Sequence, residues 1–62
     1  MKPIRLVLVD DHAILRQGLR SVLERADDLI VVGEAASESE GEAVVRATSP
    51  DVVLLDLKLS AG

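Results

Sequence analysis

The chain contains no cysteine, no phenylalanine, tyrosine or tryptophan, and only two prolines among its 62 residues. Without cysteine, neither a disulfide nor a zinc-thiolate site can stabilise the fold, and without aromatic residues the core must be aliphatic. A chain this short buries only about 60% of its unfolded surface, so its own core is marginal. We therefore expect one small domain, or a piece of one, that needs a partner surface, most simply a second copy of itself.

Basic charge is also scarce, because seven Lys and Arg residues are scattered along a chain of formal net charge -4. A nucleic-acid surface needs a clustered basic patch, so we expect no nucleic-acid contact by this segment. No apolar run approaches the roughly 20 residues that span a bilayer, and the start lacks the pattern of a cleavable signal. We expect a soluble, cytoplasmic protein without membrane contact.

Apolar runs alternate with helical periodicity along the chain. The runs at about 4–10, 29–34 and 52–57 are apolar on both faces, which is typical of parallel strands covered by helices. Amphipathic helices are expected at about 12–25 and 38–48, the second with a thinner apolar face. The predicted class is α/β, in the order β-α-β-α-β. Right-handed crossovers allow both helices on one face of the sheet, or strand order 2-1-3 with a helix on each face.

Local signals mark the helix ends and two glycines. Asp11 can cap the first helix, and Ser37 and Glu40 have the spacing of a capping box before the second. Gly18, in the middle of the first helix, costs up to about 1 kcal/mol relative to alanine, so we expect close packing on the sheet there. Gly41 interrupts the second helix.

Acidic residues follow two of the predicted strands at their carboxyl ends. In strand order 2-1-3 those strands are neighbours, so Asp10, Asp11 and Asp56 would meet at the topological switch point where such sheets bind ligands. Mutual repulsion would raise the pKa values of the three carboxyl groups, and a hard cation such as Mg²⁺ would relieve it with oxygen ligands. A carboxylate beside that ion can act as a nucleophile toward a phosphoryl group.

Other polar residues receive a structural interpretation. We expect His12 to be an exposed residue of the first helical turn rather than a ligand. Arg16 and Arg20 are expected on the solvated face of the first helix. An acidic cluster fits a solvated helix start, which the helix dipole favours. It consists of Glu34, Glu38, Glu40 and Glu42.

The segments "VLVDDHAILRQGLRSVLE", "VVGEA" and "PDVVLLDLKL" resemble the receiver domain of bacterial two-component response regulators. Within that family they are similar to the NarL/FixJ subfamily, whose members carry a LuxR-type helix-turn-helix output domain. The resemblance covers nearly the whole chain. It implies a flavodoxin-like doubly wound parallel sheet, of which residues 1–62 form the amino-terminal half, in a parent that is a phosphorylation-controlled DNA-binding transcription regulator and not an enzyme.

The resemblance also implies roles for individual residues. Asp56 corresponds to the phosphoacceptor, which receives its phosphoryl group from a histidine kinase. Asp10 and Asp11 correspond to the acidic pair that binds Mg²⁺, together with Asp56 and the backbone carbonyl of Lys58. The kinase is expected on the exposed side of the first helix, around Ile14, Arg16 and Gln17.

The chain also departs from a complete receiver. The hydroxyl residue of the fourth strand and the lysine of the fifth, which bind the phosphoryl oxygens in the family, are absent, so this chain is not expected to switch. The usual Met-Pro after the acceptor strand is Leu59-Ser60. The third strand would expose an apolar edge that invites pairing, and we expect an antiparallel two-fold dimer in the order 2-1-3-3'-1'-2'. The edge residues are Val52, Val53, Leu54, Leu55 and Leu57.

Two alternatives to a signalling module remain open. One is a structural or engineered half-fold that assembles without phosphotransfer chemistry. The other is a Mg²⁺-dependent phosphatase similar to the haloacid dehalogenases, which need a second aspartate two residues after the nucleophile. His12 and Lys58 occupy that position after Asp10 and Asp56, so the phosphatase is disfavoured.

Overall fold

The structure is a computed structural model that describes residues 2–56. Its elements are β1 (Ile4–Val9), α1 (Ala13–Leu23), β2 (Leu29–Ala35), α2 (Glu38–Thr48) and β3 (Val52–Leu55). This is the β-α-β-α-β order predicted from the sequence. The expectations for Leu57 and Lys58 lie outside the described residues. Within residues 2–56, neither helix combines the length and the apolar character that a membrane crossing requires.

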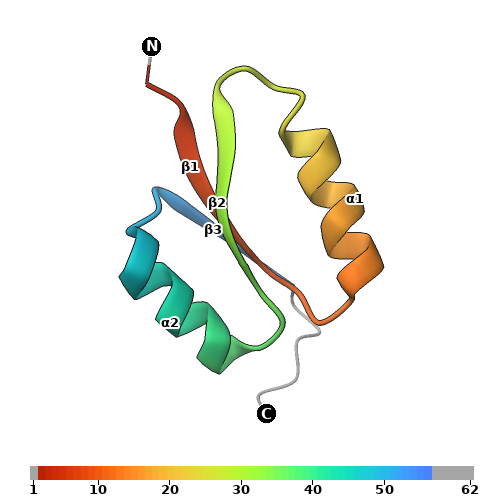
Figure 1. The fold of residues 1–62 in the computed structure, drawn as a ribbon, viewed down its shortest axis with the longest axis vertical. Helices are drawn as coiled ribbons and strands as arrows, with labels where there is room; N and C mark the ends of the chain where they lie inside the picture. The colour runs from red at the N-terminus through yellow and green to blue at the C-terminus, as the bar shows by residue number, and fades with distance from the viewer. Residues whose placement is uncertain (1, 57–62) are drawn as a thin grey trace.

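The three strands form one parallel sheet in the order β2-β1-β3, so β1 is central. Figure 1 shows α1 and α2 on opposite sides of the strands. Of the two arrangements that right-handed crossovers allow, the chain therefore adopts the doubly wound one. The predicted fold class is confirmed.

The core is built around β1, because this strand has a neighbour on each side and a helix over each face. Its two sets of side chains alternate between the faces. On the α2 face, Val7, Val9 and Ala35 are buried and are covered by Val44 and Val45. The other buried hydrophobic residues are Leu6, Leu8 and Val31. The core is wholly aliphatic, as the composition requires.

The two helices approach the sheet differently. Gly41 of α2 is buried, and a Cβ atom placed on it would lie 3.0 Å from Cγ2 of Val9, so a glycine is what lets this helix come close to β1. Gly18 of α1 has nothing within 4 Å of the same hypothetical atom. The expectation of close packing at Gly18 was wrong, because α1 has no buried residue and makes fewer contacts with β1 and β2 than α2 does.

The helix ends follow the sequence in part. Before α2, the Glu40 backbone N–H donates to the hydroxyl of Ser37, as the capping box predicted. The Glu40 carboxylate reaches back to the N–H of Ala36, one residue beyond the cap. The predicted cap at Asp11 was wrong: α1 begins after His12, and no side chain caps it.

A β-bulge changes the pairing of β1 with β2. Leu6 pairs with Val31, but the next residue, Val7, pairs with Gly33, so one residue of β2 is extra. Leu8 then pairs with Glu34. Because a one-residue slip moves a side chain to the opposite face of a sheet, the bulge places Glu34 on the side of α1 instead of the side of α2.

Candidate functional site

Four residues converge at the carboxyl ends of β1 and β3. They are Asp10, Asp11, His12 and Asp56, and one potential ligand atom from each lies within 4.8 Å of the others. Backbone bonds beyond the strand ends fix two of them: the N–H of Asp10 donates to the Ala35 carbonyl at 3.0 Å, and that of Asp56 donates to Val9 at 3.0 Å. The predicted meeting of the three aspartates at this edge is observed.

The carboxylates differ in exposure. The side chains of Asp10 and Asp56 are 12% and 20% exposed, whereas that of Asp11 is 39% exposed. Asp10 and Asp56 therefore form the base of this acidic site, and Asp11 lies at its mouth.

His12 lies among the carboxylates, although the sequence indicated only an exposed residue of the first turn. Its Nδ1 atom is 2.9 Å from Asp10, 3.0 Å from Asp11 and 3.6 Å from Asp56. The hydrogen bond with Asp10, followed by the charge of Asp11, raises the pKa of His12. The side chain is 61% exposed, so the ring reaches into the acidic site from solvent.

Asp10 is held as an ionised acceptor. The backbone N–H of His12 donates to its Oδ1 atom at 2.8 Å, and this bond is the main cause of a lowered pKa for Asp10. The expectation that crowding would raise the pKa was wrong for this residue, because hydrogen bonds and neighbouring positive charge outweigh desolvation and repulsion.

The donor set fits a hard divalent cation. Mg²⁺ prefers carboxylate oxygens and commonly keeps several waters, and the partly exposed Asp11 leaves the mouth accessible to them. The ring nitrogen of His12 already lies where the three carboxylates stabilise positive charge. The residues that would hold the ion are Asp10, Asp11 and Asp56; the expected carbonyl ligand of Lys58 lies outside the described residues.

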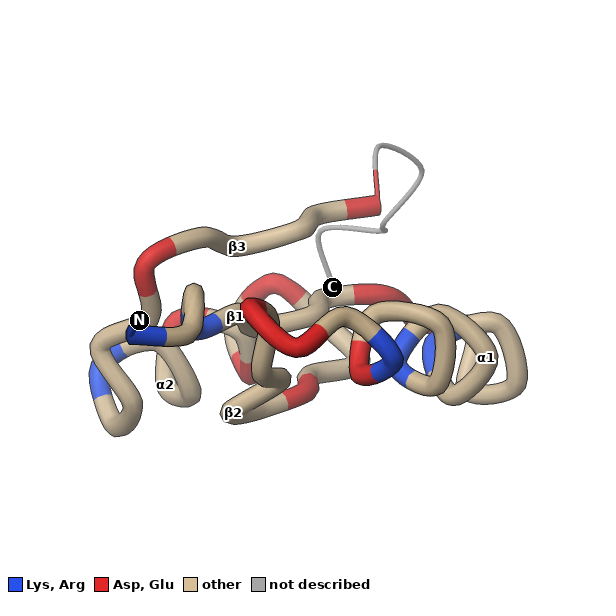
Figure 2. Tube along the Cα trace, turned by 90° about the horizontal axis from the view of Figure 1, so that it is seen from above, with Lys and Arg blue, Asp and Glu red and all other residues tan. Residues whose placement is uncertain are grey.

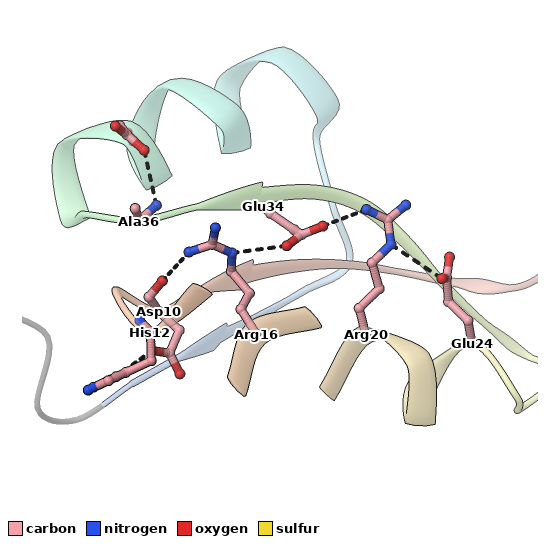
Figure 3. Close-up of polar contacts among 8 residues, drawn as sticks. Asp10, His12, Arg16, Arg20, Glu24, Glu34 and Ala36 are labelled. Atoms are coloured by element: carbon pink, nitrogen blue, oxygen red, sulfur yellow. Dashed lines mark hydrogen bonds and ion pairs between the residues drawn. The ribbon is translucent and has the colours of Figure 1, made fainter. Parts of the chain in front are cut away.

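A chain of ion pairs lies beside the acidic site, between α1 and β2 (Figure 3). The Nε of Arg16 donates to Glu34 at 2.9 Å, and its Nη1 donates to the backbone carbonyl of Asp10. The Nη1 of Arg20 donates to the other Glu34 oxygen, and its Nε donates to Glu24 at 3.2 Å. The assignment to a solvated face was wrong for Arg16, whose side chain is 17% exposed, and holds in part for Arg20, whose side chain is 43% exposed. The assignment of Glu34 to a helix start was wrong.

Glu34 lies at the centre of these ion pairs, a structural role that the interpretation of the sequence did not assign to it. Its side chain is 21% exposed. Burial alone would raise its pKa, but the hydrogen bonds from Arg20 and Arg16 outweigh burial, and its pKa is lowered. The sequence offered one signal, a glutamate inside a short apolar strand, but its partners depend on the bulge.

The residues expected to face a kinase separate into two groups. Ile14 is 87% exposed, and Gln17 is also exposed. Arg16 is turned toward the sheet, with a side chain only 17% exposed, so it does not belong to the exposed side of α1.

The expected dimer edge is accessible. The exposed fractions along β3 are 41% for Val52, 41% for Val53, 37% for Leu54 and 55% for Leu55. Figure 2 shows β3 as an uncharged strand with acidic residues at both ends.

A doubly wound parallel sheet with an acidic cluster at its switch point defines a class of α/β proteins that bind ligands at this edge. Comparison with known proteins places the chain within that class. The family described as "Response regulator receiver domain" matches residues 6–62. The chain belongs to this family, which confirms the resemblance seen in the sequence.

Curated relatives include a transcriptional regulatory protein and a response regulator. The transcriptional regulatory protein LiaR of Bacillus subtilis (strain 168) is 48% identical over 54 residues, which cover 87% of this chain and 26% of LiaR. The nitrate/nitrite response regulator protein NarL of Escherichia coli (strain K12) is 38% identical over 94% of this chain and 27% of its own length. The chain thus spans about a quarter of the length of these curated relatives.

A solved structure shows the same arrangement. The two-component response regulator of the LuxR family from Aurantimonas sp. SI85-9A1 superposes with a TM-score of 0.89 and 44% identity, over 95% of this chain and 42% of that one. The likeness therefore extends from the motifs to the three-dimensional fold.

Proposed function

We propose that this chain carries the phosphoacceptor site of a response regulator, with Asp56 as the residue that is phosphorylated. The observation that carries the proposal is the convergence of the Asp56 carboxylate with Asp10 and Asp11 at the switch point. Asp10 and Asp11, with Asp56, would hold Mg²⁺. The ion would neutralise the phosphoryl oxygens as a carboxylate oxygen of Asp56 approaches the phosphorus atom.

The bond changes are those of a simple transfer. An Oδ atom of Asp56 forms a bond to phosphorus, and the bond between phosphorus and the donor group breaks, so the donor leaves with the electron pair. In the parent protein the donor would be a phosphorylated histidine of a kinase, docked against the exposed side of α1 at Ile14 and Gln17. We propose a cytoplasmic, DNA-binding transcription regulator as that parent, and the name of LiaR, a transcriptional regulatory protein, supports its role in transcription.

A small phosphodonor tests the acceptor directly. The 62-residue chain is incubated with acetyl phosphate and Mg²⁺, and its mass is measured. We expect a gain of one phosphoryl group that is absent in Asp56→Asn and strongly reduced in Asp11→Asn, which keeps the acceptor but removes a ligand. Phosphorylation of Asp56→Asn to the level of the wild type, or none in the wild type, would contradict the assignment.

We also propose that β3 pairs with β3 of a second copy, antiparallel across a two-fold axis. Among the described residues, β1 is the only strand beside β3, and all four residues of β3 are more than a third exposed. An apolar strand with an open edge is a template for another strand.

Sedimentation velocity at micromolar concentrations tests this pairing. A dimer is expected for the wild type and a monomer for Val53→Lys, because a charged lysine on an edge strand disfavours pairing. The matched control is Ile30→Lys on the other edge strand, β2, where the wild-type residue is 43% exposed. A wild-type monomer that unfolds cooperatively would rule the dimer out.

A further inference from the structure

The loop that carries Asp10 and Asp11 is held by a hydrogen bond to the sheet and also by one from a side chain. The N–H of Asp10 is bound to Ala35 of β2 at 3.0 Å, which fixes the amide side of the residue. Its carbonyl is bound by the Nη1 of Arg16, one helical turn into α1. Both sides of the Asp10 backbone are therefore tied, one by the sheet and one by a side chain.

Arg16 makes this bond from a fixed position. Its Nε donates to Glu34 at 2.9 Å, and both side chains are mostly buried, with exposed fractions of 17% and 21%. A guanidinium has donors in a rigid plane, so anchoring Nε on Glu34 also aims Nη1. Figure 3 shows the Arg16 side chain between Glu34 and Asp10.

Arg20 offers an internal comparison. It also binds Glu34, through its Nη1, and its second contact goes to Glu24 on the same helix. Both arginines thus attach α1 to β2 through one carboxylate. Only Arg16 continues to the backbone of a residue in the acidic site.

We propose that Arg16 is a positioning residue for the acidic site, with Glu34 as the anchor that orients its guanidinium. The proposal rests on the proposed metal and phosphoacceptor function. The Arg16 guanidinium contacts Glu34 and the backbone carbonyl of Asp10, and through that carbonyl it sets the turn from which Asp10 and Asp11 project. Groups that orient the ligands of a metal affect its affinity without contacting it.

The matched variants Arg16→Lys and Arg20→Lys test this role. Each keeps a positive charge that can pair with Glu34 and loses the second contact of the planar group. Mg²⁺ affinity is measured by titration of backbone amide shifts in the 62-residue chain. We expect the dissociation constant to rise about tenfold in Arg16→Lys and to stay near the wild-type value in Arg20→Lys. Equal effects in the two variants would overturn the proposal.

A second measurement does not need the metal. The N–H of His12 donates to the Asp10 carboxylate at 2.8 Å, so its hydrogen exchange reports how firmly the turn is held. In metal-free protein we expect this amide to exchange faster in Arg16→Lys than in Arg20→Lys. If the wild type bound no Mg²⁺, the proposed function would fail, and equal exchange in the two variants would separately refute the positioning role.

Glu34→Gln provides the same test if Arg16→Lys does not fold. An amide keeps an oxygen that can accept one of the two guanidinium bonds. We expect Mg²⁺ to bind more weakly to this variant than to Arg20→Lys. Wild-type affinity in Glu34→Gln would show that the anchor does not matter.

Discussion

The two helices of this small domain are attached to the same sheet by different forces. Helix α2 is packed by shape: Gly41 lies against Val9, and Val44 and Val45 cover the aliphatic cluster. Helix α1 has no buried residue and is attached through guanidinium bridges to Glu34.

The difference teaches that an amphipathic pattern shows which face of a helix can be covered, not how much of it is covered. Helix α1 has the stronger apolar stripe in the sequence, yet Ile14, Leu15 and Val22 are 87%, 59% and 61% exposed. Helix α2 has the thinner stripe and the closer contact. Small residues at the point of approach decide how closely a helix packs, because they set the distance between helix and sheet.

The largest effect is expected at the polar attachment. Glu34→Ala removes the acceptor of two charge-assisted bonds and should lower the free energy of unfolding by about 2 to 3 kcal/mol. Urea unfolding at fixed protein concentration measures it. The control Glu24→Ala removes only a half-exposed partner of Arg20 and should cost less than about 0.5 kcal/mol. Equal losses would mean that the bridges do not hold α1 to the sheet.

A substitution in the packed contact between α2 and β2 should lower the free energy of unfolding nearly as much. In Gly33→Ala the new methyl group would overlap Cγ1 of Val44, so we expect a loss of about 2 kcal/mol by the same unfolding assay. Val44→Ala should cost less in the Gly33→Ala background than in the wild type, because it removes the overlap. Additive losses would contradict the assigned contact.

A pair of helix glycines sharpens the comparison. Gly18→Ala should raise the free energy of unfolding by about 1 kcal/mol, because alanine favours the helix and the new methyl group meets nothing within 4 Å. In Gly41→Ala the new Cβ atom would lie 3.0 Å from Val9. The free energy of unfolding should therefore rise less than in Gly18→Ala, or fall. An equal gain in the free energy of unfolding at both positions would show that α2 does not need its close approach to β1.

The smallest effect is one of pH. The pKa of Glu34 is lowered from its ordinary value of 4.5, so the folded state binds the proton less tightly than the unfolded state. The stability that this carboxylate contributes is therefore present above pH 4.5 and is lost as the pH falls through the lower, folded-state pKa. Glu34→Gln should show a smaller loss of stability on acidification. A loss as steep as that of the wild type would assign the effect to other groups.

Much of the fold and part of the site could be predicted from the sequence. Apolar runs placed the strands, and the capping pattern placed the start of α2 at Glu38, where the structure has it. The acids after β1 and β3 were predicted to meet because parallel strands end at the same edge. The glycines were misjudged because nothing local distinguishes Gly18 in open space from Gly41 against Val9.

The sequence by itself determined the element order, the aliphatic core and the acidic edge, because these follow from periodicity and from where each strand ends. Tertiary structure alone decided which side chains of α1 meet Glu34 of β2. The bulge in β2, opposite the step from Leu6 to Val7, turns Glu34 toward α1. Only then can Arg16 bind both Glu34 and the carbonyl of Asp10. Register is a relation between two strands, so no pattern within either strand contains it.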